Sequence, residues 1–189
     1  KEYTHDIVKG PNDVDLHFFY KNNPKTTENW KQLQPLMVKV MDFYNQKVGQ
    51  YPYKQYSFIQ GGDGGMEYAM CTLMLGNGTL EGILGTATHE LGHSWFQHIL
   101  ASNESKHPWM DEGFTTYIED MALNELKGDK KVANPFKGNY AAYYSLVNSG
   151  KEQPQTTHGD RYDENRPYSI SSYIKGSIFL SQLEYVIGK

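Results

Sequence analysis

The chain has 189 residues, of which 38% are hydrophobic and 14% aromatic, a composition that suits one globular core. Its 22 acidic and 18 basic residues give a formal net charge of −4 and form no basic block, so we expect no nucleic-acid partner. No apolar run approaches the roughly 20 residues that span a bilayer, and Lys1 begins no basic-then-apolar signal sequence. We therefore expect no membrane insertion.

The N-terminal part of the chain predicts a strand, a helix and a second strand. Residues 14–20 alternate weakly between polar and apolar types and predict a strand, and Asn-Asn-Pro at 22–24 marks a turn. Apolar residues then recur at helical spacing up to Gly49, and Pro35 would either begin or kink that helix. A short strand follows at residues 56–60. The apolar residues of the helix, which we expect in the core, are Leu33, Leu36, Met37, Val40, Met41, Tyr44 and Val48.

A glycine-rich run at residues 61–65 precedes a second apolar segment, residues 68–75, which predicts one strand. Gly64 and Gly65 would let a peptide backbone lie against the strand edge, with the Glu67 carboxylate placed to bind a protonated α-amine. The alternative is an ordinary tight turn followed by a surface glutamate.

Residues 89–93 read His-Glu-Leu-Gly-His within a helix predicted at about 80–100. Successive helical residues turn by about 100°, so His89 and His93 lie one above the other and can bind one zinc ion. Glu90, about a quarter turn away, can reach a water on that metal as a general base. An apolar stripe on another face would pack the helix; the alternative is two unrelated surface histidines. That stripe contains Leu84, Ala87, Leu91, Trp95 and Ile99.

Catalytic zinc usually has three protein ligands and one open position, so a third ligand is expected. Glu112 follows His93 after eighteen residues, enough for a helix to end, a loop to turn back and a second helix to begin. The loop closes with Pro108, which is favoured in the first turn of a helix. Glu112 would then lie near the start of an antiparallel partner helix at 109–127. A last helix is predicted at 169–187.

Taken in order, these motifs resemble those of the aminopeptidase N-like zinc metallopeptidases, a gluzincin family that includes leukotriene A4 hydrolase. The resemblance runs from about Tyr44 to the C-terminus. Tyr68 stands where most relatives carry asparagine, so no role of that asparagine is carried over. The matching segments are Gly-Gly-Met-Glu-Tyr at 64–68, similar to the exopeptidase motif Gly-x-Met-Glu-Asn; His89, His93 and Glu112 with their spacer; and Ser-Tyr-Ile-Lys-Gly at 172–176, similar to the catalytic-tyrosine segment.

The resemblance implies an α+β fold, a thermolysin-like catalytic domain in which a small mixed sheet packs on the zinc helix and its partner helices. We expect residues 1–189 to form a single catalytic domain, excised from a longer protein because no initiator methionine is present. Full-length relatives add an N-terminal β domain and a C-terminal helical domain, which cannot fit in this length. Export to the periplasm or cell surface is favoured over the cytoplasm, because many similar bacterial enzymes act outside it.

The same resemblance implies a zinc-dependent aminopeptidase that hydrolyses the N-terminal bond of peptides with a free N-terminus. One zinc ion per chain would be held by His89, His93 and Glu112. Glu90 would act as the base, and the Tyr173 phenol would stabilise the oxyanion, although its helical spacing equally suits packing. Substrate would lie against Gly64, Gly65, Met66 and Glu67.

Zinc-bound histidines usually donate their second N–H to a carboxylate or carbonyl, and Glu119 or Asp111 would serve here unless both are simply solvated. A thermolysin-like endopeptidase is an alternative with the same zinc chemistry and no need for Glu67. A hydrolase of small epoxides is possible within the family. A degenerate binding module that keeps only the fold is the third alternative, and the intact base Glu90 argues against it.

Overall fold

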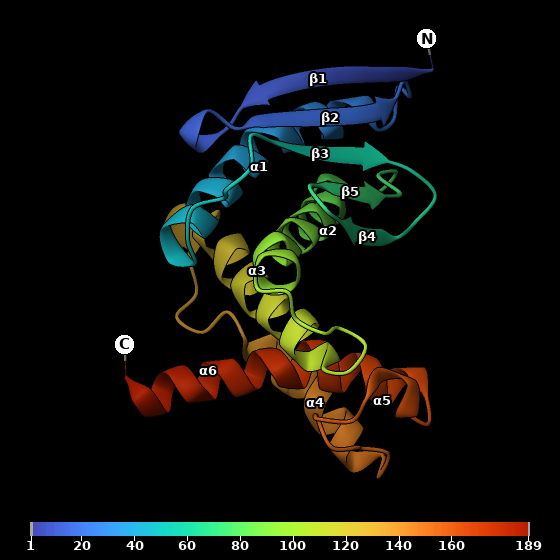
Figure 1. Ribbon diagram of the computed structural model, residues 1–189, viewed down its shortest axis with the longest axis vertical. Helices are drawn as coiled ribbons and strands as arrows, with labels where there is room; N and C mark the ends of the chain where they lie inside the picture. The colour runs from blue at the N-terminus through green and yellow to red at the C-terminus, as the bar shows by residue number, and fades with distance from the viewer. Residues whose placement is uncertain (1, 189) are drawn as a thin grey trace. The chain divides into compact units, whose positions relative to one another are not determined.

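The computed structural model describes residues 2–188, which form two compact units, Lys1–Ser94 and Trp95–Lys189. The first unit combines a sheet with two helices, and the second is helical (Figure 1). The α+β prediction is therefore confirmed, while a single domain over 1–189 stays a prediction. The first unit contains β1 (Tyr3–Lys9), β2 (Asp15–Lys21), α1 (Thr27–Lys47), β3 (Gln55–Gln60), β4 (Gly65–Tyr68), β5 (Cys71–Met74) and α2 (Leu80–His93), with a 3-10 turn at Pro11–Asp13.

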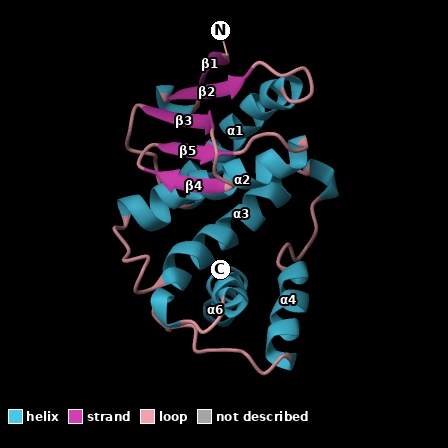
Figure 2. Ribbon diagram, turned by 90° about the vertical axis from the view of Figure 1, so that its right-hand side faces the viewer, coloured by secondary structure: helices cyan, strands magenta, loops and turns pink. Residues whose placement is uncertain are grey.

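The five strands form one mixed sheet in the order β1-β2-β3-β5-β4 (Figure 2). The pairs β1–β2 and β4–β5 are antiparallel, whereas β2–β3 and β3–β5 are parallel, with α1 as the crossover between β2 and β3. The small mixed sheet that the resemblance implied is thus present. β4 is an edge strand, paired with β5 alone among the described strands.

The core of the first unit lies between one face of the sheet and helices α1 and α2. Alternation along β2, β3 and β5 turns every second side chain to this face, and these side chains are buried. The helical stripe of α1 meets them, and α2 packs on β4 and β5. Of the residues predicted for the core of this helix, Leu36 and Val48 are only half-buried, whereas Leu33, Met37, Val40, Met41 and Tyr44 are buried. The largest fully buried side chains are Leu16, Phe18, Tyr20, Trp30, Leu33, Met37, Met41, Tyr44, Tyr56, Phe58, Met74 and Leu91.

The structure corrects one expectation in the first unit and excludes one of the two alternatives for Pro35. The single strand predicted at residues 68–75 is wrong: a turn at Ala69 and Met70 splits this region into β4 and β5, and Met70 has a φ of 59°. Neither turn residue is glycine, proline or asparagine, so the sequence carried no signal for it. Pro35 does not begin the predicted helix, because α1 starts two turns earlier at Thr27 and contains the proline.

The second unit is built from helices of mixed type. Helix α6 crosses α3 (Figure 1), and the turn η6 packs on η3, α4 and α5. Trp109 makes an edge contact with Phe179, and Tyr117 stacks on Phe136. Among residues 2–188, no helix is both long and apolar enough to cross a membrane. The elements after α2 are η2 (Ser94–Ile99), η3 (Trp109–Gly113), α3 (Phe114–Glu125), α4 (Lys137–Asn148), α5 (Asn165–Ser169), η6 (Ile170–Lys175) and α6 (Gly176–Ile187), with 3-10 turns at Gly128–Lys130 and Gly159–Arg161.

Three of these elements, η2, η3 and η6, are π-helical turns, which contain more residues per turn than an α-helix. The first directly follows α2 and changes the phase of its apolar stripe. Ala87, Leu91 and Trp95 are buried as predicted, but Ile99 is 39% exposed. The prediction that Ile99 packs with the stripe is therefore wrong.

Candidate active site

Helix α2 carries both histidines of the predicted zinc pair. Its first turn is capped by Thr79, whose hydroxyl accepts a hydrogen bond from the Gly82 N–H at 3.2 Å. The Nε2 atoms of His89 and His93 lie 3.1 Å apart, and His93 is buried. Two nitrogens each about 2.1 Å from one tetrahedral zinc ion lie roughly 3.4 Å apart, so this pair fits a shared metal with little movement.

The carboxylate of Glu90 lies against the backbone of β4. Glu90 is 7% exposed, and a Cβ atom added to Gly65 would clash with its Oε1 atom and with the Thr86 methyl group. Only a residue without a side chain fits at Gly65 as the structure stands. From the sequence, this glycine was expected to let a substrate backbone approach; the structure adds that the carboxylate of the predicted base also lies close to it.

The alternation of β4 places its side chains relative to that base. Gly65 faces α2, so Glu67, two residues further on, faces the same side of the sheet, and Met66 and Tyr68 face the opposite side. Glu67 is half-buried, whereas Met66 and Tyr68 are exposed. The predicted amine-binding carboxylate and the predicted base thus share one face of the sheet, while the role of Met66 in substrate binding stays a prediction.

In the second unit, Glu112 and Tyr173 are joined by a hydrogen bond. The Tyr173 hydroxyl donates to Glu112 Oε1 at 2.7 Å, and Glu112 is 8% exposed. Both side chains come from π-helical turns, Glu112 from η3 and Tyr173 from η6. The sequence placed both residues in the site but did not predict their contact.

Two glycines bring these turns together. A Cβ atom on Gly113 would lie 2.8 Å from the Gly176 Cα, and one on Gly176 would lie 2.7 Å from the Gly113 Cα. Because neither residue has a side chain, the two backbones are in direct contact. Gly113 is the residue after Glu112, and Gly176 is three residues after Tyr173. The glycine at the end of the Tyr-Ile-Lys-Gly segment therefore has a packing role that periodicity could not indicate.

Lys175, also in η6, is held by an ion pair. Its Nζ atom lies 2.5 Å from Glu152 Oε1, which also accepts a hydrogen bond from the Tyr143 hydroxyl at 3.1 Å. The hydrogen bond from Lys175 is the main cause that lowers the pKa of Glu152 below its usual value. This pair ties the tyrosine-bearing turn to the segment that follows α4.

The predicted supporting carboxylates also lie in the second unit. Asp111 is buried in η3, and Glu119 is half-buried on α3. Their role beside a zinc-bound histidine stays a prediction, as do the individual roles of the other site residues.

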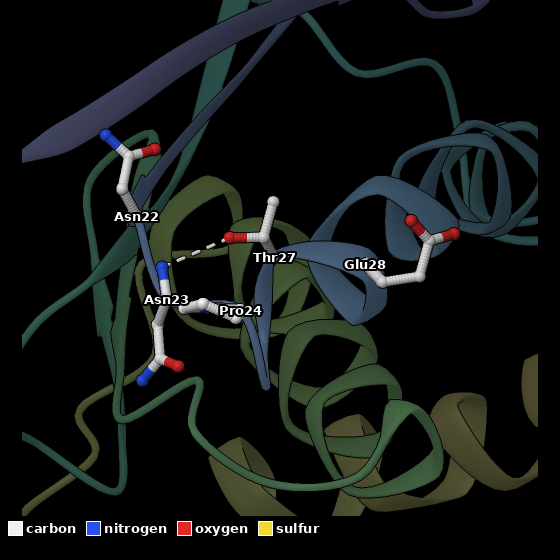
Figure 3. Close-up of a pocket in the computed structure, with 5 residues that line it drawn as sticks. All are labelled: Asn22, Asn23, Pro24, Thr27 and Glu28. Carbon is white, nitrogen blue, oxygen red and sulfur yellow. Dashed lines mark hydrogen bonds between the residues drawn. The ribbon is translucent and has the colours of Figure 1, made fainter.

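The first unit also has a surface pocket whose lining residues belong to none of the sequence motifs. It is lined by residues of the β2–α1 connection and the first turn of α1, where the Asn23 N–H donates to the Thr27 hydroxyl at 3.2 Å (Figure 3). None of its lining residues belongs to a predicted site. The lining residues are Asn22, Asn23, Pro24, Thr27 and Glu28.

Comparison with known families gives a match to the peptidase family M1 domain over residues 34–189. The chain belongs to peptidase family M1. This M1 chain is 28% identical over 134 residues to Leucine aminopeptidase 2 of Candida albicans, covering 62% of the chain and 21% of that protein. It is 32% identical over 105 residues to Leucine aminopeptidase 2 of Ajellomyces capsulatus, covering 53% and 17%.

Solved structures of M1 proteins have the same fold as this chain. The M1 zinc metallopeptidase of Deinococcus radiodurans matches with a TM-score of 0.71 and 20% identity, over 100% of this chain and 40% of that one. Yeast LTA4 hydrolase in complex with Bestatin matches with a TM-score of 0.67 and 19% identity, over 100% and 31%. The M1 chain thus spans about a fifth of the curated relatives and less than half of these solved chains.

Proposed function

We propose that this M1 chain carries the catalytic centre of a zinc-dependent aminopeptidase that hydrolyses the N-terminal bond of peptides. Membership of the family supports the peptidase class. The observation that carries the aminopeptidase assignment is the shared face of Glu67 and Glu90, with the Gly65 backbone against the Glu90 carboxylate. A peptide that added to the β4 edge would meet Glu67 with its ammonium group.

The proposed metal ligands are His89, His93 and Glu112, one zinc ion per chain. The spacing of the two ring nitrogens suits a shared ion, and two imidazoles with one carboxylate form a donor set typical of catalytic zinc. When bound, zinc supplies a Lewis acid that polarises the substrate carbonyl and makes water nucleophilic at neutral pH.

The side chains of the chain itself would perform the remaining steps. Glu90 would take a proton from the attacking water and return it to the leaving amine. Tyr173, whose hydroxyl donates to Glu112, would redirect that proton to the oxyanion that develops on the substrate carbonyl. Glu67 would hold the α-ammonium, so that only the first peptide bond reaches the reacting groups.

The first test compares a leucine-initiated dipeptide amide with its N-acetylated form as substrates. Leucine is chosen because two relatives are leucine aminopeptidases by name. We expect cleavage of the free amine only, and Glu67→Gln should lower its kcat/KM about 10- to 100-fold, since a charged hydrogen bond contributes about 1.5–3 kcal/mol. Equal cleavage of the blocked peptide would favour an endopeptidase instead.

The second test is Glu90→Gln, which removes the base but keeps the size of the side chain. Turnover should fall to background while bound zinc is unchanged, because Glu90 is not among the proposed ligands. Full activity in this variant would disprove the assignment of the base.

A further inference from the structure

The backbone carbonyl of Glu90 lies where the regular part of α2 ends. In an uninterrupted α-helix it would accept from the Ser94 N–H, but that N–H points to the carbonyls of Leu91 and Gly92. The Tyr56 hydroxyl, which comes from β3, donates to the Glu90 carbonyl at 3.3 Å. The predicted base is therefore tied to the sheet through its own backbone.

The Tyr56 hydroxyl makes a second hydrogen bond, with a residue of β5. Its hydroxyl oxygen lies 2.6 Å from the Thr72 hydroxyl, and both residues are fully buried. Burial raises the pKa of Tyr56 well above its usual value, so the phenol keeps its proton. A carbonyl oxygen can only accept, so the arrangement in which both hydrogen bonds are made has Thr72 as the donor to Tyr56. The bonds then run in one direction, Thr72 to Tyr56 to the Glu90 carbonyl, and polarise each other.

This chain of hydrogen bonds begins beside the proposed amine anchor. Thr72 is the residue directly opposite Glu67 in the pairing of β5 with β4. Strand pairing fixes the backbone of Glu67 to Thr72, and the two hydroxyls fix Thr72 to the backbone of Glu90. The distance between the amine-binding carboxylate and the base thus depends on two buried hydroxyl groups.

We propose that Tyr56 and Thr72 are positioning residues that hold the base Glu90 in place relative to the amine anchor Glu67. The proposal rests on the proposed aminopeptidase function. Neither residue touches substrate; both act through the backbone of α2. Nothing in the sequence pattern distinguishes them from other strand residues of the core.

Single-atom changes test this role. Tyr56→Phe deletes only the hydroxyl, and we expect kcat to fall about tenfold with KM within about twofold, since substrate is still bound while the base is misplaced. Thr72→Val should lower kcat less, and Thr72→Ser, which keeps the hydroxyl, should restore it. Combining Tyr56→Phe with Thr72→Val should cost little more than Tyr56→Phe alone. Zinc content should stay at the wild-type value in every variant.

The matched control is Tyr51→Phe. Tyr51 is another buried tyrosine of the first unit; its ring makes an edge contact with that of Tyr56, and its hydroxyl donates to a backbone carbonyl of β3, that of Gln55, at 3.0 Å. Its kcat should stay at the wild-type value. If both variants changed kcat equally, or if Tyr56→Phe raised only KM, the positioning role would be overturned.

A second readout does not need turnover. In metal-free protein, amide hydrogen exchange in the last turn of α2 should be faster in Tyr56→Phe than in Tyr51→Phe. Unchanged exchange would contradict the anchoring of α2, whether or not the protein is active. An inactive wild type would instead disprove the proposed function, so the two failures are distinguishable.

Discussion

The two compact units hold their functional side chains by different means. In Lys1–Ser94, buried hydroxyl groups bind carbonyls of α2: Tyr44 donates to Thr88 at 2.9 Å and Tyr56 to Glu90 at 3.3 Å. In Trp95–Lys189, two glycine backbones touch and bring neighbouring π-helical turns together. Removing a hydroxyl group should therefore weaken the first arrangement, whereas adding a methyl group should weaken the second.

Among changes in the second unit, the largest effect should come from Tyr173→Phe, which removes a hydroxyl without adding an atom. We expect kcat to fall about 10²- to 10³-fold, as for other oxyanion donors, with zinc content near the wild-type value. The measurement is steady-state kinetics together with elemental analysis. Tyr117→Phe is the matched control, because Tyr117 also donates to a carboxylate of this unit, Glu184 Oε2, at 2.8 Å. A loss of zinc in Tyr173→Phe, absent from Tyr117→Phe, would make Tyr173 a support of the ligand Glu112 instead.

Adding one methyl group tests the glycine contact. Gly176→Ala should lower the free energy of unfolding by about 1–3 kcal/mol, because its Cβ would lie 2.7 Å from the Gly113 Cα and the turns must separate. Gly138→Ala, on α4 of the same unit, has no atom within 4 Å of the new Cβ and should be neutral or stabilising. Urea unfolding of both variants measures the difference. Equal stabilities would show that the glycine contact does not hold η3 and η6 together.

The smallest effect concerns the ion pair between Lys175 and Glu152. Since Lys175 lowers the folded-state pKa of Glu152, the pair stabilises the protein fully above the usual glutamate pKa of about 4.3, and this contribution is lost as the pH falls through the lowered value. Glu152→Gln should cost about 1 kcal/mol or less at pH 7, and less in acid. Urea unfolding at both pH values tests this.

Glu164→Gln is the control for that change. It breaks the pair of Lys151 with Glu164, which has the same 2.5 Å distance but is about half exposed. Its effect at pH 7 should be smaller than that of Glu152→Gln. If Glu164→Gln lowered the free energy of unfolding as much as Glu152→Gln, the greater burial of the Lys175–Glu152 pair would add nothing to its stabilising effect.

Regular elements were predictable from the sequence, because their periods are local properties. The alternation of residues 14–20 and 56–60 and the helical spacing of residues 33–48 matched β2, β3 and α1. The pair His89 and His93 could be placed on one helix face for the same reason. Glu112 followed from its spacing after His93, and the family resemblance supplied Tyr173 and the role of Glu67.

Two kinds of feature could not be predicted: contacts between residues far apart in the sequence, and local turns that lack a recognisable residue pattern. The contact of Gly113 with Gly176 joins residues 63 positions apart. The π-helical turn after His93 shifts the helical phase and exposes Ile99, and the turn at Ala69 and Met70 lacks turn-forming residues. The link from Tyr56 to Glu90 arises only when the sheet packs on α2.

The central claim is that His89, His93 and Glu112 bind one zinc ion. Elemental analysis of purified, zinc-supplied protein tests it most directly, with His93→Ala and Glu112→Gln measured beside the wild type. We expect about one zinc per chain in the wild type and its loss in both variants. A folded wild type without zinc, or zinc that persists in both variants, would contradict the claim and favour a binding module that keeps only the fold.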